Sequence, residues 1–70
     1  MLLTINGKEL SFEENPLSIS SLLKKLNIEE QVVAISLNTD IVKKDKWSIT
    51  TLKEKDNLEL LHFMGGGLSL

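Results

Sequence analysis

Residues 17–28 read LSISSLLKKLNI, and this stretch decides the fold because it predicts one short amphipathic helix. Its apolar residues recur at i, i+3, i+4 and i+7, which places them on one face of a helix: they are Ile19, Leu22, Leu23 and Leu26. Ser18 precedes them, where its hydroxyl can accept from the amides of the first turn. Asn27 can end the helix in a left-handed conformation. A single helix cannot bury such a stripe by itself, so the rest of the chain must cover it.

The flanking sequence predicts strands that can do so. Residues 1–5 alternate in the period of a strand, and Asn6-Gly7 is a hairpin signal because both residues tolerate positive φ. A second strand over residues 8–13 follows. The run VVAISL at residues 32–37 is β-branched and nearly all apolar, and residues 58–63 form the last strand after a turn. A brief extended piece at residues 41–42 lies between them.

This order of elements predicts an α+β domain of the β-grasp type. If the first and last strands lie side by side at the centre, a mixed sheet of four to five strands packs on one main helix. We expect a domain over residues 1–63 and a flexible glycine-rich tail over residues 64–70. The pairing of the terminal strands comes from knowledge of folds and not from periodicity.

Composition narrows the function. A chain of 70 residues has little room for an enclosed active site, which disfavours a self-sufficient enzyme. There is no cysteine, so no disulfide or thiolate metal site is expected, and this suits a reducing cytoplasm. A net charge of −2 gives no basic footprint for nucleic acid, and no apolar run reaches membrane-spanning length.

Four segments in this order resemble the ThiS family, the small sulfur carriers of thiamine biosynthesis. They are INGKEL in the first hairpin, the Leu-Leu-x-x-Leu helix, SLNTDIV followed by a tryptophan, and DNLELLHFMGGG near the end. The likeness spans residues 1–67. It implies the ubiquitin-like β-grasp fold.

The resemblance also implies a chemistry that needs no catalytic side chain, metal or cofactor in the carrier. An ATP-dependent ThiF-type enzyme adenylates the terminal glycine carboxylate, a persulfide replaces AMP, and the thiocarboxylate passes sulfur to a ThiG-type thiazole synthase. On this chain the acceptor is Gly67, with Gly66 beside it and Gly65 in the tail. Glycine suits the role because a Cβ would crowd the approach of ATP and of sulfur.

Two features depart from the family pattern. Asn38-Thr39 stands where the family commonly has Asn-Gly, which puts the form of that turn in doubt. More seriously, Leu68, Ser69 and Leu70 follow the glycines, so Gly67 has a peptide bond where the chemistry needs a free carboxylate. Three interpretations stay open: a precursor that a peptidase trims, a remnant of cloning, and a member that has lost the chemistry.

Strand alternation predicts which residues meet the partner. The residues expected to face the helix are Leu3, Ile5, Val33, Ile35, Leu37, Leu58 and Leu60. The residues expected on the opposite, uncovered face are Leu2, Val32, Ala34, Leu61 and Phe63. An apolar strip of this kind on a small protein indicates a docking face, and here we expect the activating enzyme on it.

Other interpretations concern single residues and other classes of protein. The sequence supplies no second metal ligand or nucleophile for His62, so a structural or solvent-facing role is expected for it. Trp47 is expected to plug one end of the core. A molybdopterin-type carrier is the nearest alternative, although its usual proline pair before the glycines is absent. A β-grasp binding module with an inert tail is the alternative from a different class, in which the glycines are only a linker.

Overall fold

A computed structural model describes the chain except for residues 30, 65, 66 and 70; for residues 62–64 and 67–69 it describes the backbone only. The elements in chain order are β1 (Leu2–Ile5), β2 (Lys8–Ser11), β3 (Leu17–Ser18), α1 (Ile19–Lys25), β4 (Val32–Leu37), β5 (Asp40–Val42), a 3₁₀ turn η1 (Lys44–Lys46), β6 (Thr51–Leu52), β7 (Asn57–Met64) and β8 (Gly67–Ser69).

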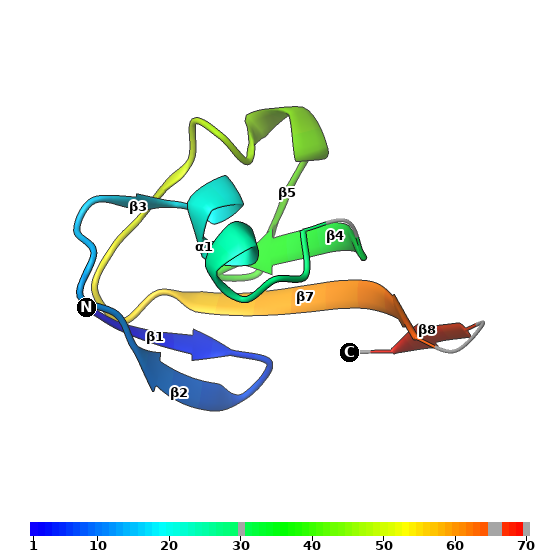
Figure 1. Cartoon of the computed structure of the whole chain (residues 1–70), viewed down its shortest axis with the longest axis horizontal. Helices are drawn as coiled ribbons and strands as arrows, with labels where there is room; N and C mark the ends of the chain where they lie inside the picture. Colours follow the sequence, from blue (N-terminus) through cyan, green and yellow to red (C-terminus); the bar gives the residue numbers. More distant parts are fainter. Residues whose placement is uncertain (30, 65–66, 70) are drawn as a thin grey trace.

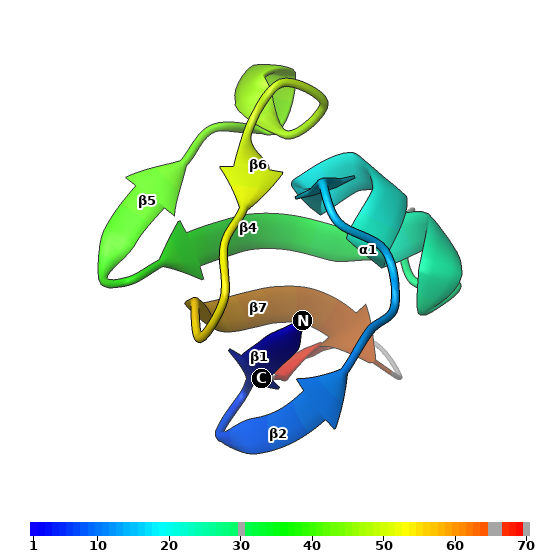
Figure 2. The ribbon, with the colours of Figure 1, turned by 90° about the vertical axis from the view of Figure 1, so that its left-hand side faces the viewer.

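The main sheet has the order β2-β1-β7-β4-β5, and β8 pairs with β7 outside this path. The β1–β7 pair is parallel and the other pairs are antiparallel, so the sheet is mixed. Figure 1 shows α1 lying over one face of the sheet. Figure 2 shows β5, β4, β7, β1 and β2 in succession, curving around one side of α1. The predicted β-grasp arrangement, with the first and last predicted strands adjacent, is confirmed.

The helix begins where the sequence predicts. The Ser18 hydroxyl accepts from the amide of Ser21 at 3.1 Å. The amides of the first two helical residues donate to backbone carbonyls in the crossover, the segment between β5 and β6. Ile19 donates to Thr50 at 3.0 Å and Ser20 donates to Trp47 at 3.1 Å. These bonds satisfy donors that a helix start leaves without partners. The short sheet β3–β6, which the sequence does not predict, joins the same two segments.

The other end of the helix is fixed by a left-handed residue and an ion pair. Asn27 has φ of 60°, as predicted for the residue that ends the helix. Lys25 Nζ lies 2.6 Å from the carboxylate of Glu14 in the segment before β3. The hydrogen bond from Lys25 lowers the pKa of the Glu14 carboxyl. Because the pair is exposed, it contributes little to stability.

Two tight turns with positive φ set the strand registers. Asn6 and Gly7 have φ of 51° and 81° and join β1 to β2. Asn38 and Thr39 have φ of 50° and 77° and join β4 to β5. Despite the departure at Thr39, both residues of this turn have positive φ, as at Asn6-Gly7. The departure places a β-branched residue in a backbone region that favours glycine, and this costs on the order of 1–2 kcal/mol.

The core lies between α1 and the sheet. Its buried apolar residues are Leu3, Ile5, Phe12, Leu17, Ile19, Leu22, Leu23, Val32, Ile35, Trp47, Leu52, Leu58 and Leu60. Trp47 is buried as expected, and its indole N–H donates to the carbonyl of Val42 at 2.9 Å. Every apolar residue of the helical stripe except Leu26 is fully buried, and Leu26 packs against the same cluster.

Replacing Thr39 by glycine should stabilise the protein by about 0.5–1 kcal/mol, because relief of the left-handed strain exceeds the added freedom of the unfolded chain. The free energy of unfolding in urea measures this. Thr51 is the matched control, since it is also exposed but lies in β6 without positive φ. Thr51→Gly should lower stability. An equal loss at both positions would contradict strain at Thr39.

Candidate functional site

The glycine-rich tail follows β7, the strand at the centre of the sheet. β7 reaches Met64, one residue past the predicted end of the domain, and the backbone of Gly67–Ser69 forms β8. In the antiparallel register, His62 lies opposite Ser69, Phe63 opposite Leu68 and Met64 opposite Gly67. The predicted site residues Gly65 and Gly66 lie outside the described residues. The division into a domain of residues 1–63 and a flexible tail of residues 64–70 stays a prediction.

The sheet face turned away from α1, the open face, carries part of the predicted docking strip. Leu2, Ala34 and Leu61 are each partly buried on it. Ala34 lies directly opposite Leu61 on the neighbouring strand, so these two side chains are cross-strand partners. Phe63 lies in β7, but its side chain is outside the described part of the chain, as is that of His62. Ala34 and Leu61 therefore lie near the start of the tail, whereas Leu2 lies beside the beginning of β7, at the other end of the open face.

The prediction for Val32 is wrong. Val32 is 1% exposed and belongs to the core, whereas Val33, expected to face the helix, is 43% exposed. The cause is a β-bulge: Val32 lies opposite His62 and Ala34 opposite Leu61, so Val33 is an extra residue in the ladder. A bulge breaks the two-residue alternation on which the prediction depended. From Ala34 onward the predicted faces hold.

Ile41 also lies on the open face, although the predicted docking strip does not include it. It lies opposite Ser36 on β4, and Ser36 lies opposite Glu59 on β7. Its side chain is 72% exposed. When strand alternation is continued through the two-residue turn at Asn38-Thr39, it places Ile41 on this face. The position of Ile41 can therefore be predicted from sequence. The apolar residues of the open face thus extend from β1 to the edge strand β5.

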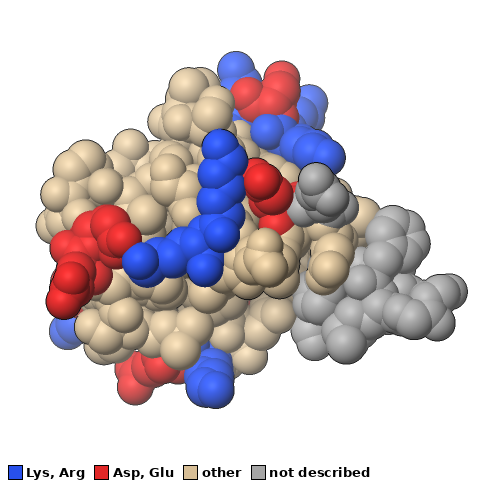
Figure 3. Space-filling view, viewed as in Figure 1, with Lys and Arg blue, Asp and Glu red and all other residues tan. Residues whose placement is uncertain are grey.

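Two acidic side chains lie on this face. Among the described strand residues of the open face, the charged ones are Glu9 opposite Thr4 and Glu59 opposite Ser36, and both are exposed. On the face that α1 covers, lysines and acidic residues lie beside one another and form no single basic patch (Figure 3). Because Glu59 stands on the central strand β7 and Glu9 on the edge strand β2, a partner of the open face should carry both apolar and basic groups.

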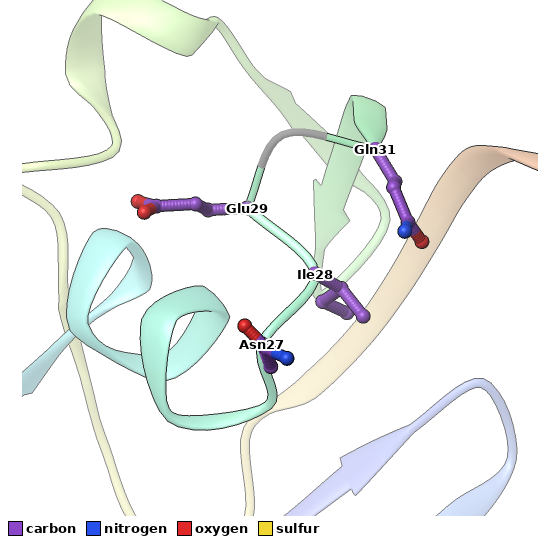
Figure 4. Close-up of a pocket in the computed structure, with 4 residues that line it drawn as sticks. All are labelled: Asn27, Ile28, Glu29 and Gln31. Atoms are coloured by element: carbon purple, nitrogen blue, oxygen red, sulfur yellow. The ribbon is translucent and has the colours of Figure 1, made fainter.

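The described residues offer no enclosed site. A shallow open pocket of about 300 Å³ follows α1 and is lined by Asn27, Ile28, Glu29 and Gln31. Figure 4 shows Glu29 and Gln31 pointing away from each other, so the polar groups do not converge on a ligand. Among the described residues no three His, Asp or Glu side chains cluster as metal ligands. No helix in that part of the chain is long and apolar enough to span a membrane.

Comparison of the sequence with known proteins assigns the chain to one family. The ThiS family model matches residues 2–67. The sulfur carrier protein ThiS of Bacillus subtilis (strain 168) is 30% identical over 66 residues, covering 94% of this chain and all of that protein. A thiazole synthase of Paramagnetospirillum magneticum (strain ATCC 700264 / AMB-1) is 34% identical over 67 residues, covering 96% of this chain but only 20% of that protein.

A solved structure agrees with the sequence comparison. The crystal structure of thiamine biosynthesis protein ThiS from Geobacter metallireducens superposes with a TM-score of 0.80 at 36% identity, covering 96% of this chain and all of that one. The fold is thus a ubiquitin-like β-grasp of the kind found in small carrier proteins. The chain belongs to the ThiS family. The predicted role, a sulfur carrier of thiamine biosynthesis and not itself a catalyst, is confirmed at the level of the family.

The corrected faces can be tested with two neighbouring valines. Val32→Ala should lower the free energy of unfolding by about 2 kcal/mol, because it removes buried methyl groups and leaves a cavity. Val33→Ala should change it by less than about 0.5 kcal/mol. Urea unfolding of both variants measures the difference. The reverse order would restore the unbulged register.

Proposed function

We propose that Gly67 is the sulfur acceptor of this carrier and that the peptide bond between Gly67 and Leu68 is cleaved before the chain can act. The observation that carries this proposal is that the family match ends at Gly67 while the chain continues for three residues. A carrier of this family reacts through a terminal carboxylate on glycine. Hydrolysis after Gly67 creates that group.

Three steps make up the proposed reaction sequence. A carboxylate oxygen of Gly67 attacks the α-phosphorus of ATP, and pyrophosphate leaves. The terminal sulfur of a persulfide then attacks the acyl carbon, AMP leaves, and a thiol cleaves the resulting sulfur–sulfur bond to free the thiocarboxylate. The carrier contributes the carboxylate and a recognisable surface, and other proteins supply the catalytic groups.

The proposed partners are a ThiF-type activating enzyme with its persulfide donor and a ThiG-type thiazole synthase. Support for the second comes from the Paramagnetospirillum protein, in which a ThiS-like stretch forms one fifth of a chain named thiazole synthase. A carrier sequence inside such a chain favours direct contact between the two activities. The proposed final product is the thiazole ring of thiamine.

We place the docking of the activating enzyme on the open face. Leu2, Ala34, Leu61 and Phe63 remain the proposed contact residues, Val32 is excluded by its burial, and Ile41 is added. The face lies on the strand that continues into the tail, so an enzyme bound there has the tail within reach. The apolar residues of the face and its two glutamates, Glu9 and Glu59, can give this contact both affinity and orientation.

A chain that ends at Gly67 should be adenylated and thiolated, whereas the 70-residue chain should not react. The longer chain presents the carboxylate of Leu70, which is branched and up to about 10 Å further out. Intact-mass spectrometry after incubation with ATP, an activating enzyme and a sulfur source measures both products. In the shorter chain, Gly66→Ala should slow adenylation because its Cβ crowds the acceptor.

Equal adenylate from the two chains would contradict Gly67 as the acceptor. No reaction of the shorter chain with ThiF-type or molybdopterin-type activating enzymes would favour a binding module with an inert tail. Reaction with only the second enzyme would favour a molybdopterin-type carrier.

The docking face has a separate test. In the chain ending at Gly67, Leu61→Ala should lower kcat/KM for adenylation by about fivefold or more, since apolar residues at the centre of a contact carry most of its binding energy. Ile49→Ala is the matched control, because Ile49 is 71% exposed but lies on the crossover and not on the sheet. Equal rates for both variants would place the docking face elsewhere.

A further inference from the structure

One edge of β7 is occupied by three different parts of the chain in succession. β1 pairs with its beginning, Thr4 opposite Asn57 and Ile5 opposite Leu58. Beyond the end of β1, the side chain of Asn6 takes over: its Oδ1 accepts from the amide of Leu60 at 2.7 Å, and its Nδ2 donates to the Leu60 carbonyl at 3.4 Å. The last three residues of β7 are beyond the reach of both.

Those three residues are the ones that β8 covers. His62–Met64 pair with Gly67–Ser69, while β4 lies along the opposite edge of β7 as far as His62. An uncovered strand edge exposes backbone donors and acceptors that readily accept another extended segment. Two of the three residues that supply this cover, Leu68 and Ser69, come after the proposed cleavage point.

We propose that the end of β7, residues 62–64, is a strand-binding edge and that the extension after Gly67 latches the tail onto it. The inference rests on the proposed function, because only a carrier has a use for Gly67. In the latched chain the bond between Gly67 and Leu68 lies inside a paired strand, so the acceptor is held against its own domain. Loss of residues 68–70 removes two of the three paired positions, and a single remaining pair cannot hold the strand.

In this proposal the extension has a second role besides blocking the carboxylate of Gly67, because it also holds the tail against the sheet. A peptidase and an activating enzyme both need a tail that is not already paired, so they can bind it only when the latch opens. After cleavage the shortened tail can no longer pair with the end of β7, so the latch cannot form again. The proposed occupant of the edge in the 70-residue chain is therefore its own segment Gly67–Ser69.

Amide hydrogen exchange followed by NMR tests the latch without any sulfur chemistry. The 70-residue chain should show cross-strand proton contacts between Phe63 and Leu68, and slowed exchange among the amides of residues 62–64. In the chain ending at Gly67, exchange at any protected amide of 62–64 that faces this edge should speed up about tenfold or more, while amides of β1 and β4 stay unchanged.

A variant of unchanged length separates pairing from chain length. Ser69→Pro fixes φ and removes a backbone donor, so it should release the latch and reproduce the fast exchange of the shortened chain. Ser69→Thr is the matched control and should keep the protection, since threonine favours strands. Both substitutions lie outside the folded core, so the unfolding free energy should stay within about 0.5 kcal/mol of the parent chain.

The possible outcomes distinguish the latch from the function on which it rests. Absence of the Phe63–Leu68 contacts, or equal exchange in all four chains, overturns the latch even when the shortened chain is adenylated. Protection in the 70-residue chain that Ser69→Pro removes supports the latch. If the shortened chain then fails to react, the proposed acceptor is wrong and the strand-binding edge still stands.

Discussion

The parallel contact between β1 and β7 is the constraint on which the rest of the structure depends. It joins the first and last predicted strands of the chain, and only two residue pairs form it directly. Asn6 lengthens it by bonding both backbone groups of Leu60, and the amide of Thr4 donates to the carbonyl of Asp56 at 3.0 Å. Without this contact the N-terminal hairpin would be an isolated pair of strands, which is marginal in water. α1 would then lose part of its cover.

A second polar group holds the other side of the same junction. The carboxylate of Asp56, 9% exposed, accepts from Asn38 Nδ2 at 2.9 Å and from the amide of Lys53 at 2.8 Å. Asn38 in turn accepts from the amide of Asn57 at 2.9 Å. The turn between β4 and β5 is thereby tied to the start of β7. Such bonds matter because a buried carboxylate without partners is strongly unfavourable.

The sequence predicts the parts of this fold that depend on local chemistry. Ser18, Asn6-Gly7 and Asn27 mark their boundaries because capping and positive φ are properties of single residues and their neighbours. Alternation assigns the faces of β1, and of β7 as far as Leu61, correctly for the same reason. It fails at Val32 and Val33 because a bulge depends on the partner strand, and both residues are valine, so composition offers no correction. The roles of Asn6 and Asp56 are equally hidden, since their partners lie far away in the sequence. For the site, alternation predicts most of the open face and the glycines stay a prediction, whereas β8 follows only from the pairing.

The position of β7 explains how a chain without catalytic side chains can take part in demanding chemistry. A carrier must be bound firmly and yet present a reactive atom that another protein can surround, and these needs conflict on a single surface. β7 separates them along one strand. Its paired middle, between β1 and β4, lies at the centre of the proposed docking face, and the three residues that follow Met64 are glycines. Gly67 is the third residue after Met64, a reach of about 10 Å when extended. If an activating enzyme binds the open face as proposed, it would therefore receive the proposed acceptor Gly67 within a small, fixed radius, and recognition of the sheet would set where the reaction occurs.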